Sequence, residues 1–169
     1  MTAMSPVPEA RGAVPASPSP APPTFAAVYE TYYPRMVRLA RLSLDGAATA
    51  EEIVQDAFVQ LFRNWDQVEA PVPWLRLAVV NGCRSWGRRR QVARRHAVDP
   101  APAIVDDGDA LAVREALRAL RPRPRTAVIL RYFEDLPERE IAELLGCRPG
   151  TVKSMLARSL RQLREVLDD

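Results

Sequence analysis

Residues 135–163, DLPEREIAELLGCRPGTVKSMLARSLRQL, decide the fold of this chain. Apolar residues recur in this stretch at helical spacing on both sides of Gly146, a residue suited to a left-handed helix end. The small Ala142 precedes this glycine by four residues, and the branched Val152 follows it by six. This spacing predicts a helix-turn-helix, in which a second helix packs closely across a first.

Both helices of this stretch carry further signals. Asp135 and Glu138 predict a capping box, with Pro137 in the first turn of the first helix. The second helix should begin near Gly150, with an apolar stripe on one side and basic residues on the other. An ordinary pair of helices with a charged outer face is the alternative, but the spacing and the basic second helix favour DNA binding.

Composition sets broad limits on the rest of the chain. It has 169 residues, a net charge of +3 and 47% hydrophobic residues, so packed cores are expected. No apolar run reaches the roughly 20 residues of a membrane span, and no signal peptide precedes the first helix, so a cytoplasmic protein without membrane contact is expected. Cys83, Cys147 and His96 cannot alone make a four-ligand zinc site, and no metal or other cofactor is expected.

Charge is unevenly distributed along the sequence. Basic residues, almost all of them arginine, cluster within 84–95 and 118–164, whereas acidic residues gather within 51–56 and 106–109. This separation predicts one face for phosphate groups and another for a basic protein partner.

The N-terminal part begins without a folding pattern. Residues 1–23 are rich in Pro, Ala and Ser and bury too little apolar surface to offset their entropy, so a disordered leader is expected. A helix is then expected from Thr24 to near Leu44, and Pro34 should kink or split it.

The second helix has the cleanest amphipathic pattern in the chain. Thr49 and Glu52 predict a capping box at its start. Its outer face carries acidic and amide side chains. The residues expected to point inward are Ile53, Ala57, Phe58, Leu61, Phe62 and Trp65.

A third helix, from about Pro73, ends the N-terminal part, and Gly82 and Gly87 should weaken it. No stretch alternates with a period of two residues, so the chain is predicted to be all-α. Two small helical domains are expected, a three-helix unit over 24–93 and a four-helix unit over 109–169. A flexible linker, 94–108, should join them.

Catalytic patterns are missing from the sequence. The single histidine lies in the expected linker with no nucleophile placed to pair with it. Residues 146–154, GCRPGTVKS, resemble a phosphate-binding loop but lack the adjacent Gly-Lys pair and the preceding strand. The sequence therefore predicts that this protein is not an enzyme.

Nucleic-acid binding has better support. Residues early in a recognition helix reach base edges, so Thr151, Lys153, Ser154 and Arg158 are the expected donors. Arg148 and Arg139 are expected to hold the phosphate backbone. In the third helix, tryptophans beside arginines suit stacking on unpaired bases, but core tryptophans beside a solvated basic face explain the spacing equally well.

The order of these motifs resembles the extracytoplasmic-function (ECF) class of the bacterial sigma-70 family. The segments that carry the resemblance are YETYYPRMVRLA (29–40), AEEIVQDAFVQLFRNW (50–65), PVPWLRLAVVNGCRSWGRRR (71–90), LRPRPRTAVILRYFEDL (120–136) and the helix-turn-helix. The resemblance implies domains called sigma-2 and sigma-4. It also implies a dissociable subunit that brings core RNA polymerase to promoter DNA.

The resemblance also assigns roles to residues. It implies that the β′ clamp of the polymerase is contacted by Glu52, Val54, Gln55, Asp56, Phe58, Leu61 and Trp65. It implies that the −10 element is opened and read by Asn64, Trp74, Arg76, Asn81, Arg84 and Arg88, with a flipped base held in the loop of 64–73. It implies that the −35 element is read by Arg139, Arg148, Thr151, Lys153, Ser154 and Arg158.

Further partners follow from the same resemblance. The polymerase β flap is implied as a contact besides the β′ clamp, and anti-sigma factors are common in the class. Met155 departs from the pattern, because the family often has arginine there. The residues alone leave two other functions open, a free-standing helix-turn-helix regulator and a helical adaptor that binds only protein.

Overall fold

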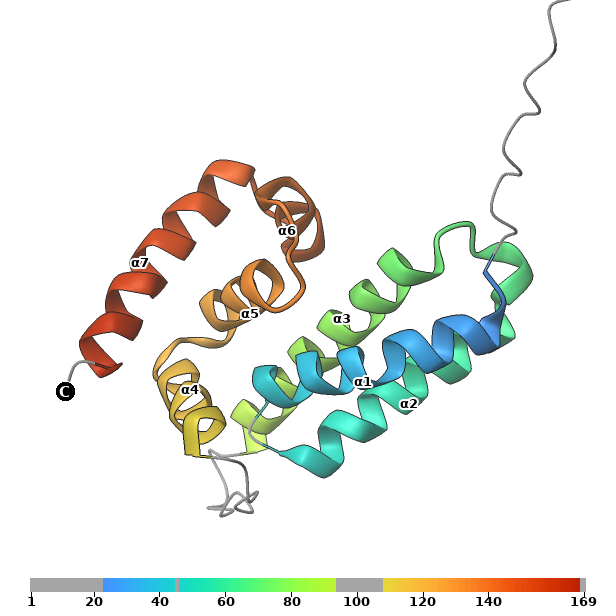
Figure 1. Cartoon of the computed structure of the whole chain (residues 1–169), viewed down its shortest axis with the longest axis horizontal. Helices are drawn as coiled ribbons and strands as arrows, with labels where there is room; N and C mark the ends of the chain where they lie inside the picture. The colour runs from blue at the N-terminus through green and yellow to red at the C-terminus, as the bar shows by residue number, and fades with distance from the viewer. Residues whose placement is uncertain (1–22, 45, 94–107, 168–169) are drawn as a thin grey trace, which may run out of the picture.

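The computed structural model describes residues 23–44, 46–93 and 108–167, and every regular element in these ranges is a helix (Figure 1). The predicted all-α class is confirmed. The predicted disordered leader and flexible linker lie almost wholly outside the described residues. The helices are α1 Phe25–Ser43, α2 Ala47–Arg63, a 3-10 turn Trp65–Gln67, α3 Pro71–Ala93, α4 Gly108–Ala119, α5 Pro122–Tyr132, α6 Glu138–Leu145 and α7 Pro149–Leu167.

The first three helices pack on one another as an N-terminal unit. The Thr24 side chain caps α1 by accepting a hydrogen bond from the Ala27 amide at 3.2 Å. α1 runs unbroken through Pro34, so the predicted split does not occur. It ends where the sequence predicted, with Leu44 as its last, capping residue.

The start of α2 differs from the prediction. The helix begins at Ala47, Gly46 occupies the cap position, and no side chain bonds to the cap. The capping box expected from Thr49 and Glu52 is therefore wrong, because both residues already lie inside the helix. The small residues Ala47 and Ala48 extend it by a good helix-forming pair.

Gly82 allows a close approach between α2 and α3. A Cβ atom at this position would lie 2.6 Å from Cγ2 of Ile53, which is well inside contact distance. The sequence marked this glycine only as a weak point of the helix. The structure shows that the missing side chain lets the two helices pack closely, which offsets its poor helix propensity.

The last four helices form a C-terminal unit in which α7 packs against α4, α5 and α6. Its core includes Ile129 from α5, Ile141 from α6, and Val152 and Leu156 from α7. The predicted helix-turn-helix is present as α6 and α7 (Figure 1).

Gly146 ends α6 as predicted, with a left-handed φ of 61°. The Cys147 amide bonds to the Ala142 carbonyl at 2.9 Å, and the Gly146 amide bonds to the Glu143 carbonyl at 3.2 Å. These two bonds form a Schellman motif, which satisfies the last carbonyls of the helix and sets the turn into α7.

Asp135 does not cap α6. Pro137 occupies the cap position without a side-chain bond, and Asp135 instead has a φ of 53° in the turn that follows α5. Aspartate tolerates this left-handed conformation better than most residues, which explains its place there. The predicted capping box is therefore wrong, and the turn instead carries Glu134 to the edge of the unit.

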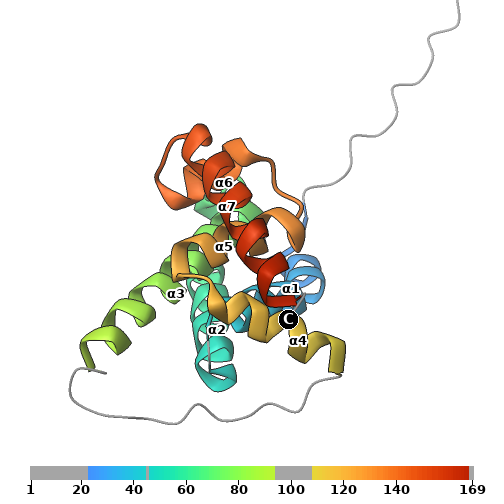
Figure 2. The same ribbon diagram turned by 90° about the vertical axis from the view of Figure 1, so that its left-hand side faces the viewer.

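The two units pack against each other, α5 against α1 and α3 and α6 against α3. Figure 1 shows the C-terminal helices on the left and the N-terminal helices on the right, with α5 beside α3, and Figure 2 shows the same arrangement from the side. Buried apolar residues of the two units form one continuous cluster. In the described part of the chain, none of the helices is long and apolar enough to cross a membrane.

Gly146→Ala should lower the free energy of unfolding by about 1 to 2 kcal/mol, because alanine strains a left-handed backbone. Gly150→Ala is the matched control. Both positions have open space for a Cβ, but Gly150 lies in the first turn of α7 without a positive φ. The control should be neutral or stabilising by about 0.5 to 1 kcal/mol. Urea denaturation measures both, and equal effects would contradict the assigned role of Gly146.

Candidate nucleic-acid and protein-binding surfaces

The exposed face of α7 begins at the turn after α6. The residues predicted to meet DNA there are all exposed, whereas Val152, Met155, Leu156 and Ser159 of the same helix are buried. The Arg158 side chain lies back along the helix, since its Nε donates to the Ser154 carbonyl at 3.2 Å, and the Ser154 hydroxyl donates to the Thr151 carbonyl at 3.1 Å. The exposed residues of this surface are Arg139, Arg148, Thr151, Lys153, Ser154 and Arg158.

Two details sharpen this surface. Arg139 on α6 lies 3.8 Å from Glu143, and both side chains are largely exposed, so the pair leaves Arg139 available to another anion. Met155, which stands where the family often has arginine, is buried against the core. The position therefore contributes to packing in this chain, and the basic surface is formed without it.

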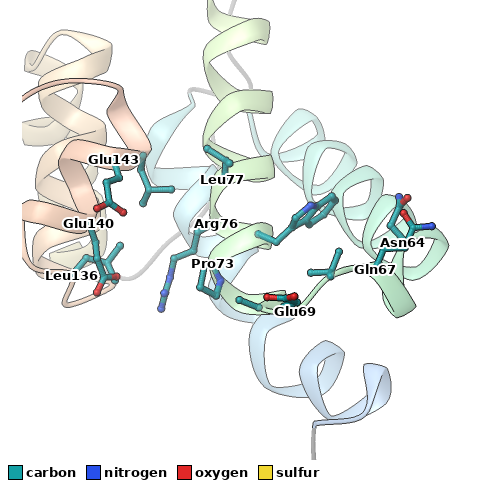
Figure 3. A pocket seen from close by; sticks show the side chains of 13 residues that line it. Asn64, Gln67, Glu69, Pro73, Arg76, Leu77, Leu136, Glu140 and Glu143 are labelled. Atoms are coloured by element: carbon teal, nitrogen blue, oxygen red, sulfur yellow. The ribbon is translucent and has the colours of Figure 1, made fainter.

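The residues predicted to meet the −10 element are divided between two places. Asn64, Trp74 and Arg76 line a cavity of about 960 Å³ whose opposite wall includes Leu136 and Glu140 of the C-terminal unit (Figure 3). Asn81, Arg84 and Arg88 lie further along α3 and are exposed. The structure therefore brings only the first three together.

The spacing of the tryptophans of α3 left two roles open, stacking on unpaired bases and packing in the core, and the structure is compatible with both. Trp74 and Trp86 are both half-buried and pack against the core. The Arg90 guanidinium lies 4.9 Å from the centre of the Trp86 ring, a cation–π contact. Each ring therefore supports the fold on one side and is accessible on the other.

The Arg76 side chain is largely buried by a contact that the sequence did not predict. Its Nε donates to Oε2 of Glu134 at 3.1 Å, and the Arg35 guanidinium approaches the same oxygen at 3.4 Å. Glu134 is among the few buried charged residues. No local sequence pattern signals this cluster, because its members are far apart in the chain.

The residues predicted to bind the polymerase clamp occupy two sides of α2. Glu52, Gln55 and Asp56 are exposed. Val54 and Leu61 are fully buried, and so is nearly all of Phe58. In this structure these three side chains pack in the core beneath the outer face of α2. Trp65 is half-buried.

Two exposed apolar residues on α2 were not predicted as contacts. Val59 is 47% exposed and Phe62 is 65% exposed. The sequence placed Phe62 in the inward stripe, which is wrong, although its ring still packs edge-on against Phe25. The exposure of Val59 could have been predicted from the sequence, because Val59 follows Gln55 by four residues and therefore lies on the same face of the helix.

Asp56 on α2 and Asn81 on α3 line one cavity of about 430 Å³ between the two helices. Arg89 of α3 also lines this cavity, so the acidic surface on α2 lies beside a basic residue of α3.

Titratable groups of the described chain form no metal site of three or more His, Cys, Asp or Glu side chains. Burial raises the pKa of the Cys83 thiol to about 12, so this cysteine stays protonated at neutral pH. Cys147 is only half-buried.

Comparisons with known proteins agree with the arrangement of these surfaces. The family model Sigma-70 region 2 matches residues 28–95, and Sigma-70, region 4 matches residues 110–163. The RNA polymerase sigma-E factor of Streptomyces avermitilis is 30% identical, over 85% of each chain. RNA polymerase sigma factor CarQ of Myxococcus xanthus is 31% identical, over 86% of this chain and 90% of the relative.

Solved structures share the fold. The sigma factor RpoE of Bartonella quintana, in complex with the anti-sigma factor NepR, matches with a TM-score of 0.72 and 25% identity. That match covers 85% of this chain and 96% of the other. CnrH, in complex with the cytosolic domain of CnrY, matches in fold with a TM-score of 0.65 and 22% identity, over 85% and 87% of the chains.

Alkylation at neutral pH should modify Cys147 much faster than Cys83. The raised pKa of Cys83 leaves almost no reactive thiolate, and its burial also blocks access. Mass spectrometry of peptides after a time course with iodoacetamide measures both rates. Modification of the two cysteines at similar rates in the folded protein would contradict the burial of Cys83.

Proposed function

This chain belongs to the ECF class of the sigma-70 family, the promoter-directing subunits of RNA polymerase, and from that premise we propose which of its surfaces bind the polymerase and the promoter. The observation that carries the proposal is the division of α7 into a buried apolar side and an exposed basic side. A helix supported in this way presents its early residues to the major groove.

The proposed polymerase surface is the outer side of α2. Its acidic and amide residues, Glu52, Gln55 and Asp56, precede the exposed apolar Val59 and Phe62 along the helix. Exposed apolar side chains beside charged ones are typical of protein interfaces, and the acidic charge suits a basic surface on the β′ clamp. Val54, Phe58 and Leu61 hold this face in place from the core.

Promoter recognition is proposed to use both units. Lys153, Ser154 and Arg158 on α7 would read bases of the −35 element, with Arg139 and Arg148 on its phosphates. The segment of 64–73, which joins α2 to the first turn of α3, and Trp74 border a cavity, which supports the capture of an unpaired base of the −10 element there. Asn81, Arg84 and Arg88 would hold the adjacent strand.

Each unit alone offers few contacts, so promoter binding should depend on the polymerase, which fixes both units at once. The C-terminal unit would meet the β flap, and an anti-sigma factor would bind surfaces that the polymerase also uses. The proposed role is one of binding without catalysis, in the bacterial cytoplasm on nucleoid DNA.

Run-off transcription with purified core polymerase on genomic templates tests this function. Promoter-specific transcripts should appear only when the protein is added. Tight operator binding without polymerase would instead indicate a free-standing regulator. If neither transcripts nor operator binding were observed, the protein would be a helical adaptor that binds only protein. Either of these two outcomes would reject the proposal.

Asp56→Arg should weaken binding to core polymerase by about tenfold or more, because it reverses charge at the centre of the acidic surface on α2. Glu115→Arg, on an exposed position of α4, makes the same charge change in the other unit and is the control. Fluorescence anisotropy with labelled protein measures both affinities for core polymerase. DNA is left out, so that an effect of the substitution on DNA binding by the neighbouring Asn81 does not enter the measurement. Equal affinities for the two variants would place the polymerase contact elsewhere.

A further inference from the structure

Glu134 connects the two helical units through a buried carboxylate. Its side chain is only 2% exposed, and its Oε2 atom accepts from Arg76 Nε at 3.1 Å and from Arg35 Nη2 at 3.4 Å. Arg35 belongs to α1 and Arg76 to α3, whereas Glu134 follows α5 in the other unit. Two guanidinium groups of the N-terminal unit therefore converge on one oxygen of the C-terminal unit.

The two arginines are held in place before any ligand arrives. The Arg35 guanidinium lies 5.3 Å from the centre of the Tyr32 ring on the same helix. The Arg76 side chain is 13% exposed beside the cavity that Trp74 and Asn64 also line. Guanidinium groups bind carboxylates and phosphates with the same donor geometry, so a site that accepts Glu134 also suits a phosphate.

The packed form of the chain cannot reach both promoter elements. Their centres are separated by about 25 base pairs, or roughly 85 Å at 3.4 Å per base pair. The two helices proposed to meet DNA, α7 and α3, are only about 28 and 35 Å long at 1.5 Å per residue. α6 packs on both of them, at about 10 Å between helix axes, so the packed form spans less than the separation of the two elements. The two units must therefore move apart on promoter DNA, and that movement withdraws Glu134 from the two arginines.

We propose that Arg35 and Arg76 form a binding site for a backbone phosphate of promoter DNA, and that Glu134 occupies this site until the units separate. The inference rests on the proposed function in placing Arg76 beside the −10 element. It adds Arg35 as a DNA contact and makes Glu134 an internal competitor of DNA. The affinity of the free chain for DNA is then reduced by the small fraction of molecules in which the site is open.

Glu134→Gln in the full chain tests the competition. The probe is a fluorescein-labelled single-stranded DNA of random sequence, titrated by anisotropy without polymerase over a series of salt concentrations. The variant should bind roughly tenfold more tightly than the unmodified chain, because the open fraction rises. Glu115→Gln, on an exposed position of α4, removes the same charge and should change affinity little.

Arg35→Gln added to Glu134→Gln tests the site itself. It should abolish the gain and reduce the dependence of log affinity on log salt by about 0.7, the slope for one phosphate contact on a single strand. Arg38→Gln, on an exposed position of the same helix, is the control in this background and should leave most of the gain. Equal slopes for the two double variants would overturn the phosphate site.

A second variant protects the test against misfolding. Phe133→Ala removes an uncharged, half-buried side chain that lines the cavity between α1 and the C-terminal unit, so it loosens the same contact without changing charge. It should also raise DNA affinity, and Arg35→Gln should cancel the rise. If neither opening variant binds more tightly than Glu115→Gln, the competition is overturned.

Run-off transcription with the unmodified chain separates this inference from the proposed function. Promoter-specific transcripts together with unchanged DNA affinity of both opening variants would reject Glu134 as competitor and leave the promoter-directing role in place. Missing transcripts would reject the role itself.

Discussion

A carboxylate can be buried between two helical units only if cations are buried with it, because an unpaired charge in the interior costs several kcal/mol. Glu134 meets this requirement through Arg35 and Arg76, and the packed form of the chain depends on the three together. Apolar packing around these residues favours contact between the two units but allows one unit to slide on the other. The ion pairs specify one relative position, in which α5 lies against α1 and α3.

Local signals in the sequence predicted the elements well, and their ends less well. The turn at Gly146 was predictable because only a left-handed residue allows α7 to follow α6 there. Asp135 and Thr49 were misread as helix caps, since the same residue types also serve in left-handed turns and inside first turns. Glu134 could not be predicted at all, because its partners lie 99 and 58 residues away in the chain.

Residue type also predicted which helices form the surfaces, but not which side chains a partner meets. The family resemblance placed Val54, Phe58 and Leu61 in a contact surface, yet the packing of α2 on α1 and α3 buries them. Val59 is exposed instead, because helical spacing turns it away from the core. Phe62 is exposed although it follows Phe58 by four residues and its ring packs against Phe25. Resemblance identifies the segment, whereas three-dimensional packing divides it into support and contact.

The close approach at Gly82 has a mechanical consequence. Because even one added carbon would collide with Ile53, α2 and α3 cannot slide or separate without losing their packing. The helix proposed to meet the polymerase and the helix proposed to meet the −10 element therefore move as one rigid body. A small rotation of α2 in its docking site therefore rotates α3 by the same amount. The position that the polymerase gives to α2 then determines how α3 is aligned on DNA.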